Sequence, residues 1–320
     1  MTTTAAVELS ELETYRTELR GYCYRMLGSA FDADDAVQET LVKAWQKADG
    51  FEGRSSVRSW LYRIATNVCL DSLRARGRRA LPMDLSSPVP ATTAPDRTLP
   101  DSAWLEPVSE TDVAPLTADP ALIVAHNDSI RLAFVAALQT LPPKQRAVLI
   151  LKEVLCWQAS EIAELLDTTV AGVNSALQRA RATLAEADLS RPALANEADK
   201  DLLARYVKAF EAYDIPSLVA LLHEDAAISM PPIAMWLQGV EDVAAWYVGF
   251  GIGCKGSRLV PTVANGMPAF GQYRVNPEGG HMAWSLQVLE VVDGRIDHIH
   301  HFLDVEKLFP RFGLDLLLPA

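Results

Sequence analysis

The sequence predicts a multidomain chain: two all-α domains, the second with a helix-turn-helix, and then a C-terminal α+β domain. Residues 8–76 and 121–190 repeat apolar side chains at the α-helical period of about 3.6 residues. A Pro-, Ser-, Thr- and Ala-rich stretch, residues 77–120, separates these helical regions. Residues 197–320 begin with helical segments and continue into β-rich runs around Asp293-Gly294, a strong hairpin signal. We therefore expect domains over residues 8–76, 121–190 and 197–320, with a linker over residues 77–120.

Composition indicates a soluble, cytoplasmic protein. The length of 320 residues suggests two or three domains, and an apolar fraction of 49% supports real cores. The formal net charge of −12 argues against a chain that coats nucleic acid without specificity. No signal peptide is recognisable at the start, and no apolar run reaches the roughly 20 residues of a membrane-spanning helix. We expect no membrane association, no cofactor and no metal, and four free thiols: Cys23, Cys69, Cys156 and Cys254.

The first helical domain contains one helix with an unusual outward face. The stretch DADDAVQETLVKAWQKA, residues 32–48, places small and apolar side chains along one side. The opposite side, at spacing i, i+3, i+4, i+7, carries Asp35, Gln38, Glu39 and Val42. Solvated helix faces usually mix both charge signs. An acidic stripe that includes an apolar residue therefore indicates a docking surface.

The next predicted helix is basic. The stretch RSSVRSWLYRIATNVCLDSLRARGRR has an apolar face surrounded by arginines and by Asn67, with Trp60 and Tyr62 interleaved. Basic side chains with interleaved aromatic rings suit a nucleic-acid surface on which bases stack. The alternative is that Trp60 lies in the core and the arginines are solvated, and for Trp60 itself we favour the core. The candidate DNA-binding residues of this helix are Arg54, Arg58, Arg63, Asn67 and Arg74.

The linker over residues 77–120 differs in composition from both neighbours. It is rich in proline and small polar residues, and from residue 81 to residue 120 it carries seven carboxylates against a single basic residue, Arg97. Such a segment buries little apolar surface, so we expect it to be extended or disordered.

Residues 160–184 have the layout of a helix-turn-helix. Ser160 is the expected cap of a first helix, and a turn at Asp167-Thr168 leads to a second helix. In that second helix Val173, Leu177 and Leu184 continue the core. The alternative is an ordinary helical hairpin with a solvated polar face. The side chains expected to project outward are of types that contact base edges and phosphates: Asn174, Ser175, Gln178, Arg179 and Arg181.

Three stretches together resemble the extracytoplasmic-function (ECF) sigma factors of bacterial RNA polymerase: DADDAVQETLVKAW, SVRSWLYRIATNVCLDSLR and LPPKQRAVLILKEVLCWQASEIAELLDTTVAGVNSALQRARATL. They match the motifs of that family in order and separation over residues 12–76 and 122–188. The resemblance implies that core RNA polymerase and promoter DNA are the partners. It also implies that Asp35, Gln38, Glu39 and Val42 dock on the clamp helices of the largest polymerase subunit.

The same resemblance assigns the two basic helices to promoter elements. The segment from Arg54 to Arg74 would open and read the −10 element, with Asn67 near the non-template strand. The helix from Val170 to Leu184 would read the −35 element. Many family members carry Lys or Arg before Ser where this sequence has Asn174-Ser175. Because Asn prefers adenine edges and Arg prefers guanine, the promoter sequence should differ accordingly.

Residues 197–320 resemble, more loosely, a SnoaL-like domain of the ketosteroid-isomerase and nuclear-transport-factor superfamily, which implies an α+β cone with a pocket. Strand alternation places His298 and His300 on one face and His301 on the other. An acid–base pair or a metal site is one interpretation of these histidines, and plain packing is the one we favour. The candidate pocket residues are Trp236, Trp246, Tyr247, Phe250, His281, Trp284, His298 and His300.

The sequence as a whole predicts a sigma factor that is not an enzyme. We expect the C-terminal domain to regulate it through intramolecular contact with the sigma domains or their linker. The alternative is an active isomerase or hydrolase fused to a DNA-binding regulator, with His281 and Asp304 as residues to test. Fold resemblance does not decide between these two, because activity depends on the site.

Overall fold

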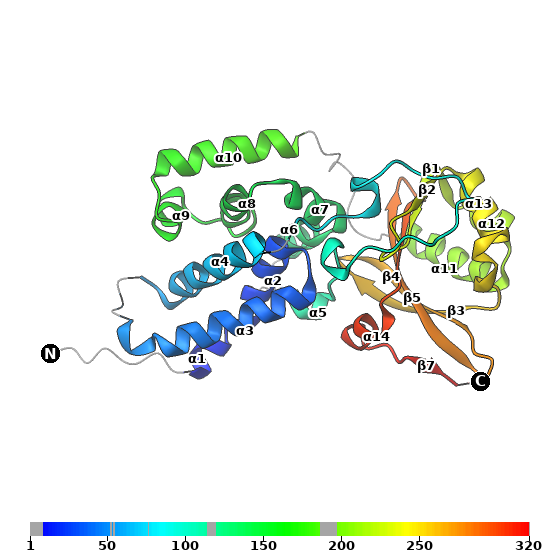
Figure 1. Cartoon of the computed structure of the whole chain (residues 1–320), viewed down its shortest axis with the longest axis horizontal. Coiled ribbons are helices and arrows are strands. Elements are labelled where there is room, and N and C mark those ends of the chain that lie inside the picture. Colours follow the sequence, from blue (N-terminus) through cyan, green and yellow to red (C-terminus); the bar gives the residue numbers. More distant parts are fainter. Residues whose placement is uncertain are drawn as a thin grey trace. The chain divides into compact units, whose positions relative to one another are not determined.

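The computed structural model describes residues 9–51, 53, 55–75, 77–113, 120–185 and 197–319. The chain divides into two compact units (Figure 1). The first comprises residues 1–79 and 105–189 and is helical, and the second comprises residues 80–104 and 190–320 and contains the sheet. The predicted fold class is confirmed.

The first unit begins with four α-helices: α1 (Leu9–Glu13), α2 (Arg16–Leu27), α3 (Ala30–Gln46) and α4 (Val57–Ala75). Gly28 and Ser29, a GS pair that the sequence marks as a helix break, separate α2 from α3. Gly28 ends α2 with a left-handed φ of 70°, and the Ser29 hydroxyl accepts a hydrogen bond from the Asp32 amide to cap α3. A Cβ on Gly28 would also stand 2.8 Å from Leu105 Cδ1, so this turn needs glycine both for its φ and for space. A short 3₁₀ turn, η1 (Ala48–Gly50), follows α3.

The second half of this unit contains α5 (Glu110–Val113), α6 (Pro120–Ile130), α7 (Leu132–Thr140), α8 (Pro143–Leu149), the π-helical turn η4 (Ile150–Val154), α9 (Ala159–Leu165) and α10 (Val170–Leu184). Pro143 occupies the first turn of α8, where its missing N–H costs nothing. The cap expected at Ser160 is wrong. Gln158 caps α9 instead, because the Glu161 carboxylate accepts a hydrogen bond from the Gln158 amide at 2.7 Å.

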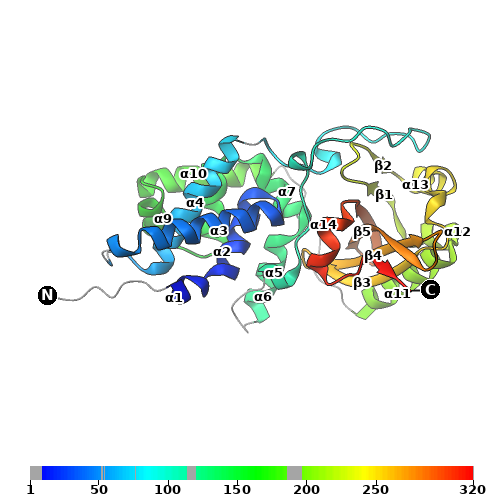
Figure 2. The same ribbon diagram turned by 60° about the horizontal axis from the view of Figure 1, so that its bottom comes forward.

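The second unit is a mixed sheet with helices packed on one face (Figures 1 and 2). The strand order is β2-β1-β6-β5-β4-β3; β1 and β6 are parallel, and every other pair along this path is antiparallel. The strands are β1 (Leu222–Ser229), β2 (Trp236–Gln238), β3 (Arg258–Ala264), β4 (Met267–Val275), β5 (His281–Val292), β6 (Arg295–Phe302) and β7 (Leu317–Leu318). Asp293 and Gly294 both have positive φ, as the predicted two-residue hairpin requires.

Helices cover the inner face of this sheet. Tyr206 and Phe210 of α11 (Glu197–Ala212) pack in one apolar cluster with Phe270 and Ile299 of the sheet. The same cluster takes side chains from α12 (Ile215–Val219), α13 (Val240–Val248) and the 3₁₀ turn η5 (Phe250–Cys254). We call this the inner face and the opposite side of the sheet the outer face. Near the C-terminal end lie α14 (Val305–Leu308) and η6 (Phe309–Phe312).

The linker is not a free segment. Over residues 80–104 its regular structure is limited to two 3₁₀ turns, η2 (Pro82–Asp84) and η3 (Asp101–Ala103), yet it is anchored along the C-terminal domain. Ala91 belongs to the apolar cluster of that domain, and the Val89 amide donates to the Trp236 carbonyl at 2.9 Å. Farther along, the Leu99 amide donates to the Pro232 carbonyl at 3.0 Å. The expectation of a disordered linker is therefore wrong for residues 80–104.

The four cysteines are free, as predicted, with Cys156 exposed and the other three buried. In the part of the chain that the structure describes, no helix has the length and apolar character needed to cross a membrane.

Candidate functional site

The outward face of α3 is exposed as predicted. Asp35, Gln38, Glu39 and Val42 are all accessible, and 42% of the Val42 surface is in contact with solvent. Glu39 pairs with Lys43 at 2.6 Å, so the stripe is less uniformly acidic than its spacing suggests. Trp45 continues the same face and is 60% exposed. The sequence interpretation missed Trp45, although it lies one turn beyond Val42 and seven residues beyond Gln38.

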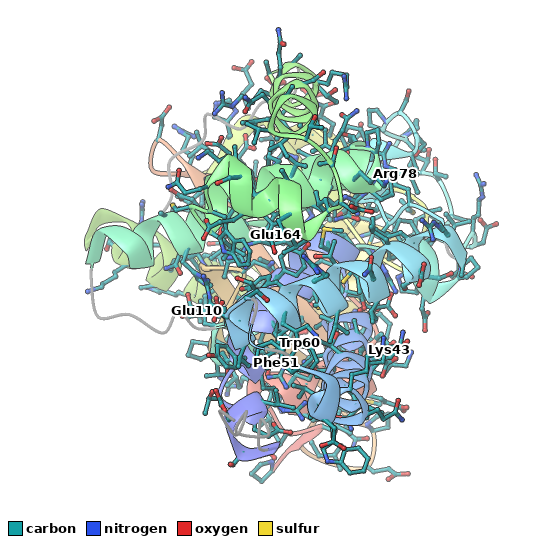
Figure 3. All side chains as sticks on the ribbon, turned by 90° about the vertical axis from the view of Figure 1, so that its left-hand side faces the viewer. Lys43, Phe51, Trp60, Arg78, Glu110 and Glu164 are labelled. Atoms are coloured by element: carbon teal, nitrogen blue, oxygen red, sulfur yellow. The ribbon has the colours of Figure 1, made fainter. Side chains whose placement is uncertain are left out.

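Helix α4 presents Arg63, Asn67 and Arg74 of its predicted DNA-binding set to solvent, whereas Arg58 is partly buried. Asn67 and Arg74 are exposed, with Arg74 paired to Asp71 at 2.8 Å. Arg54 lies outside the described residues. Trp60 is half-buried, and its ring centroid lies 4.8 Å from that of Phe51 (Figure 3). The core interpretation of Trp60 is thus closer to the structure than a fully exposed stacking ring.

Arg58 is held inside its own unit. Its guanidinium forms an ion pair with Glu18 and lies 5.3 Å from the ring centroids of both Tyr62 and Trp157. Two of its nitrogens, Nε and Nη2, are bonded to Glu18, and the side chain is 40% exposed, so part of the guanidinium is engaged within the unit and part remains accessible. No local pattern around Arg58 indicates these contacts, because Glu18 and Trp157 are far from Arg58 along the chain.

The two helical regions contact each other at α4 and α9. The rings of Tyr62 and Trp157 stand 5.1 Å apart, and Trp157 is 5% exposed. Arg63 donates to the Glu164 carbonyl at 3.0 Å, and the Glu164 carboxylate lies 3.7 Å from the same guanidinium. Arg63, which we predict to touch DNA, contacts α9 in this structure, and its side chain remains 45% exposed.

Two buried guanidiniums join α2 to the helices that follow the linker. Arg25 donates to the Ser129 hydroxyl at 2.6 Å, and Arg146 donates to the Met26 carbonyl and to Gln139 Oε1. Burial lowers the pKa of Arg25 and of Arg146 to about 10, so both remain charged near neutral pH. These partners are neutral oxygens, so they only partly offset the cost of burying charge.

The predicted outward face of α10 is confirmed. Asn174, Ser175, Gln178, Arg179 and Arg181 are all exposed, while Val173, Leu177 and Leu184 are buried. Arg179 donates to the Ser175 hydroxyl at 2.7 Å, and Arg181 pairs with Glu153 at 2.5 Å. Thr169 caps the helix by accepting a hydrogen bond from the Gly172 amide.

The anchored linker is a loop closed at its base. The Ala80 amide donates to the Ala103 carbonyl at 2.9 Å, and Ala80 bridges Trp104. In the helical unit, the buried Arg79 pairs with Asp32 at 2.7 Å and with Glu106 at 3.5 Å. Residues 79 and 106, on either side of the loop, are therefore held together.

The eight predicted pocket residues do not gather at one place. Trp246 and Tyr247 lie in the inner-face cluster, whereas Phe250 is 49% exposed beyond α13. His298 and His300 stand on the outer face with stacked rings 5.6 Å apart, and His301 faces inward, so the predicted alternation is confirmed. Trp284 carries the Arg274 guanidinium 3.3 Å over its ring, and Trp236 donates to the Ser86 carbonyl of the linker. His281 reaches the Gly256 carbonyl at 3.1 Å.

A polar network lies within the inner face. Tyr206 donates to Gln287 Oε1 at 2.7 Å, and Gln287 and Ser285 both donate to Gln272 Oε1. His301 joins through Ser285 at 3.2 Å. Burial, together with Arg274 and His300, lowers the pKa of His301 to about 3.

This depressed pKa predicts acid sensitivity of the C-terminal domain. The unfolded chain binds a proton at His301 near pH 6.5, about the usual histidine pKa, and the folded chain does so only near pH 3, so stability is lost as pH falls between them. The loss is up to about 1.4 kcal/mol per pH unit. The free energy of unfolding, measured with denaturant, should therefore decrease less between pH 7 and pH 5 for His301→Gln than for the parent. His281→Gln, at a partly exposed histidine, should follow the parent, and parallel curves for all three proteins would contradict the prediction.

Comparison with known proteins assigns families to three parts of the chain. Residues 12–79 match Sigma-70 region 2, residues 131–184 match Sigma-70 region 4, and residues 203–299 match the SnoaL-like domain.

Relatives extend over nearly the full length. ECF RNA polymerase sigma factor SigG of Mycobacterium tuberculosis is 44% identical over 319 residues, covering 94% of this chain and 82% of the relative. SigJ of the same organism is 27% identical over 312 residues, covering 91% and 89%. The crystal structure of M. tuberculosis SigJ matches with a TM-score of 0.62 at 23% identity, covering 96% of this chain and all of that one, and so shares the fold.

Proposed function

This chain belongs to the ECF RNA polymerase sigma factors and directs promoter-specific transcription initiation, and from that premise we propose a separate role for each of its parts. Helix α3 docks on core polymerase through its exposed stripe. Helices α4 and α10 read the −10 and −35 elements. The C-terminal domain regulates the protein by holding the linker between them.

The exposed face of α3 supports the docking assignment. Val42 and Trp45 give it apolar area, and Asp35 and Gln38 give it polar groups around that area. An apolar centre with a polar rim is the usual composition of a protein–protein contact, and Trp is enriched where binding energy concentrates. We assign this face, residues 35, 38, 39, 42 and 45, to the clamp helices of the largest subunit and call it the α3 stripe.

The exposed face of α10 supports reading of the −35 element. Amide side chains such as Asn174 and Gln178 pair with adenine edges in the major groove, and Arg179 and Arg181 suit phosphates. These side chains project together from one helix, which a helix-turn-helix inserts into the groove.

This division predicts different outcomes for two substitutions in α10. Gln178→Ala removes a base contact, so it should weaken the free energy of binding to the preferred −35 sequence by about 1–3 kcal/mol. It should also relax the base preference at one position of that element. Arg179→Ala removes a phosphate contact, so it should weaken all −35 sequences alike and lower the salt dependence. Run-off transcription from a library of −35 variants, made with reconstituted holoenzyme, distinguishes the two. Identical changes in sequence preference for both variants would contradict the assignment.

The closed arrangement of the helical unit is the observation that carries the regulatory proposal. The −10 and −35 elements lie about 25 base pairs apart, roughly 85 Å at about 3.4 Å per base pair. Helix α4 touches α9 of the helix-turn-helix directly, so the two readers cannot reach both elements without separating. Opening must also break the hydrogen bonds of Arg25 to Ser129 and of Arg146 to the Met26 carbonyl, which cross between the two helical regions.

The anchored linker supports a role for the C-terminal domain in this opening. Fully extended, a segment the length of residues 80–104 reaches about 80 Å, close to the distance between the promoter elements. When the segment is held as a closed loop, with Ala80 bonded to Ala103, it adds almost nothing to the distance that can separate the two helical regions. The domain that holds the loop therefore opposes the open state, and its release of the loop favours promoter binding.

Removing the domain tests this regulation. A chain ending at residue 195 leaves the linker without its anchor, so run-off transcription at limiting protein should rise at least about fivefold, the scale of ordinary allosteric coupling. In the full-length protein, Asp242→Ala removes the 2.9 Å acceptor of the Ala91 amide and should raise activity in the same direction but less. Asp225→Ala, an exposed carboxylate of β1, is the control. Unchanged or reduced transcription from both the truncated chain and Asp242→Ala would contradict the regulatory proposal, but it would not contradict the sigma factor function.

A further inference from the structure

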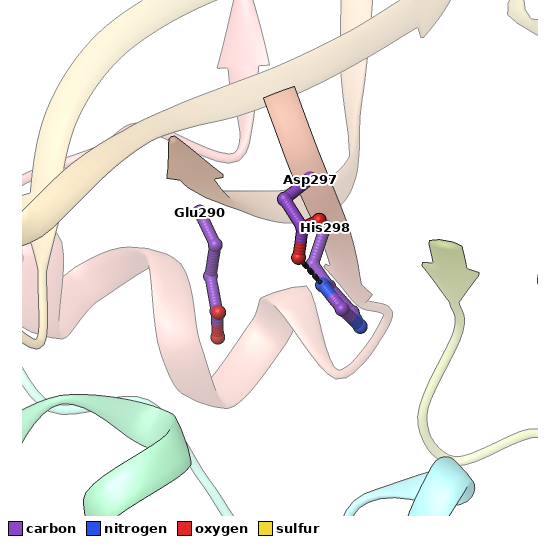
Figure 4. Close-up of side chains that lie close together, drawn as sticks. All are labelled: Glu290, Asp297 and His298. Carbon is purple, nitrogen blue, oxygen red and sulfur yellow. Dashed lines mark hydrogen bonds and ion pairs between the residues drawn. The ribbon is translucent and has the colours of Figure 1, made fainter. Parts of the chain in front are cut away.

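The outer face of the C-terminal sheet gathers acidic and imidazole side chains at one point. Glu290 of β5 lies opposite His298 of β6, and Asp297 adjoins them (Figure 4). One ligand atom from each of these three side chains lies within 4.8 Å of the other two. Glu290 is 4% exposed and Asp297 is 7% exposed, so two carboxylates share a buried position.

A β-bulge creates this convergence. The pairing of β5 with β6 shifts between Glu290↔His298 and Val291↔Ile296, which leaves Asp297 as the extra residue of β6. Ile296 and Ile299 consequently both reach the inner cluster although they are three residues apart. The bulge turns Asp297 toward the face that carries His298, where simple alternation would have placed it inward.

Two further histidines border the group. His300 Nε2 lies 3.3 Å from Glu290 Oε1, and its Nδ1 is hydrogen-bonded to the Ser229 hydroxyl at 2.9 Å, which fixes the ring. His223 Nδ1 lies 4.0 Å from Asp297 Oδ1. Three of the six histidines of the chain thus stand around two buried carboxylates.

From this geometry we propose that Glu290, Asp297 and His298 form a binding site for a divalent transition-metal ion, with His300 as an adjoining ligand. Imidazole and carboxylate together suit Zn²⁺, Mn²⁺ or Fe²⁺ better than Mg²⁺ or Ca²⁺, which favour all-oxygen sites. Ligand atoms bound at about 2.0–2.2 Å stand roughly 3.0–3.5 Å from one another. The ligand atoms of Glu290, Asp297 and His298 now lie within 4.8 Å of one another, so the side chains must close by up to about 1–2 Å to reach that range, and the 2.6 Å contact between Asp297 and His298 must widen.

The surroundings supply what a bound ion needs beyond its ligands. The Ser229 hydroxyl is hydrogen-bonded to His300 Nδ1, while His300 Nε2 faces Glu290. Metal-binding histidines are commonly oriented in this way, by a hydrogen bond to the ring nitrogen that does not bind the metal. The His298 side chain is 19% exposed and that of His223 is 42% exposed, so water reaches the edge of the site and gives an ion a path in. An ion that binds these ligands in the folded domain and not in the unfolded chain should stabilise the C-terminal domain.

Zn²⁺ titration of the full-length, untagged, chelator-stripped protein tests the site, in a Cys156→Ser background that removes the exposed thiol. Calorimetry should give one Zn²⁺ per chain, with Mg²⁺ binding far more weakly, and Zn²⁺ should raise the thermal midpoint. Asp297→Asn, Glu290→Gln and the partly exposed His298→Gln should each weaken binding at least about tenfold. Asp293→Asn, which retains the hairpin turn of the same two strands, should bind as the parent does.

The variants separate a site from a folding effect. Each is melted without metal first, and a variant with the parental midpoint that fails to gain stability from Zn²⁺ supports the site. Should Asp297→Asn or Glu290→Gln not fold, His298→Gln decides the question. Absence of stoichiometric Zn²⁺ and Mn²⁺ binding, or undiminished binding by the folded variants, would show that these side chains are hydrogen-bonded structural pairs only.

Discussion

Asp35→Lys combined with Trp45→Ala should lower the affinity for core RNA polymerase at least about 100-fold, because it removes an aromatic anchor and places a cation in the α3 stripe. Run-off transcription should fall in parallel at limiting protein. Both positions are exposed, and Trp45 is 60% exposed, so the free energy of unfolding should change by less than about 1 kcal/mol. Competition binding to fluorescently labelled core enzyme and denaturant unfolding measure the two effects.

A matched control separates docking from net charge. Asp49→Lys makes the same charge change at an exposed position just beyond the end of α3, outside the stripe. It should bind polymerase as the parent does. If Asp49→Lys is as defective as the double variant, or if the double variant binds normally, the stripe is not the polymerase-binding surface.

Locking α4 to α9 should abolish initiation. Arg63→Cys with Glu164→Cys, in a Cys156→Ser background, places two accessible thiols where the side chains now meet, while the remaining cysteines are buried. A short bismaleimide then holds the two readers together. Since promoter elements roughly 85 Å apart cannot both be read in that state, the run-off transcript should drop to the level of core enzyme alone.

The same double variant capped with a monofunctional maleimide is the control, because it carries identical substitutions and stays free to open. It should retain transcription, reduced only by the loss of Arg63. Normal transcription from the crosslinked protein would contradict the need for opening, and would leave the closed arrangement as the active one. Binding of the locked protein to core enzyme, measured in parallel, tells whether the block precedes or follows docking.

Much of the fold was predictable because it follows from local rules. The period of apolar residues set α3, α4 and α10, and Gly28 marked the end of a helix through its left-handed φ. The Asp293-Gly294 turn and strand alternation set the β5–β6 hairpin and the opposite faces of His300 and His301. The exposed side chains of α3 and α10 followed from helical spacing alone.

The misses concern contacts between residues far apart in the chain. No nearby residue indicates that Arg58 stacks on the Trp157 ring or that Arg63 bonds to Glu164. Likewise, the composition of the linker predicted little apolar burial, but a few residues such as Ala91 suffice to anchor it when a complementary surface is supplied elsewhere in the chain.

By itself, the sequence determined the type and order of the domains, and which helical faces are polar. Helix periods, caps and turn residues act over a few residues, and for that reason they can be recognised without knowledge of the partners. Only the tertiary structure decided which arginines form contacts within the helical unit, how the linker is held, and that Asp297 joins Glu290 beside His298. The last depends on one residue inserted into a strand, since a shift of one position moves a side chain to the other face of a sheet.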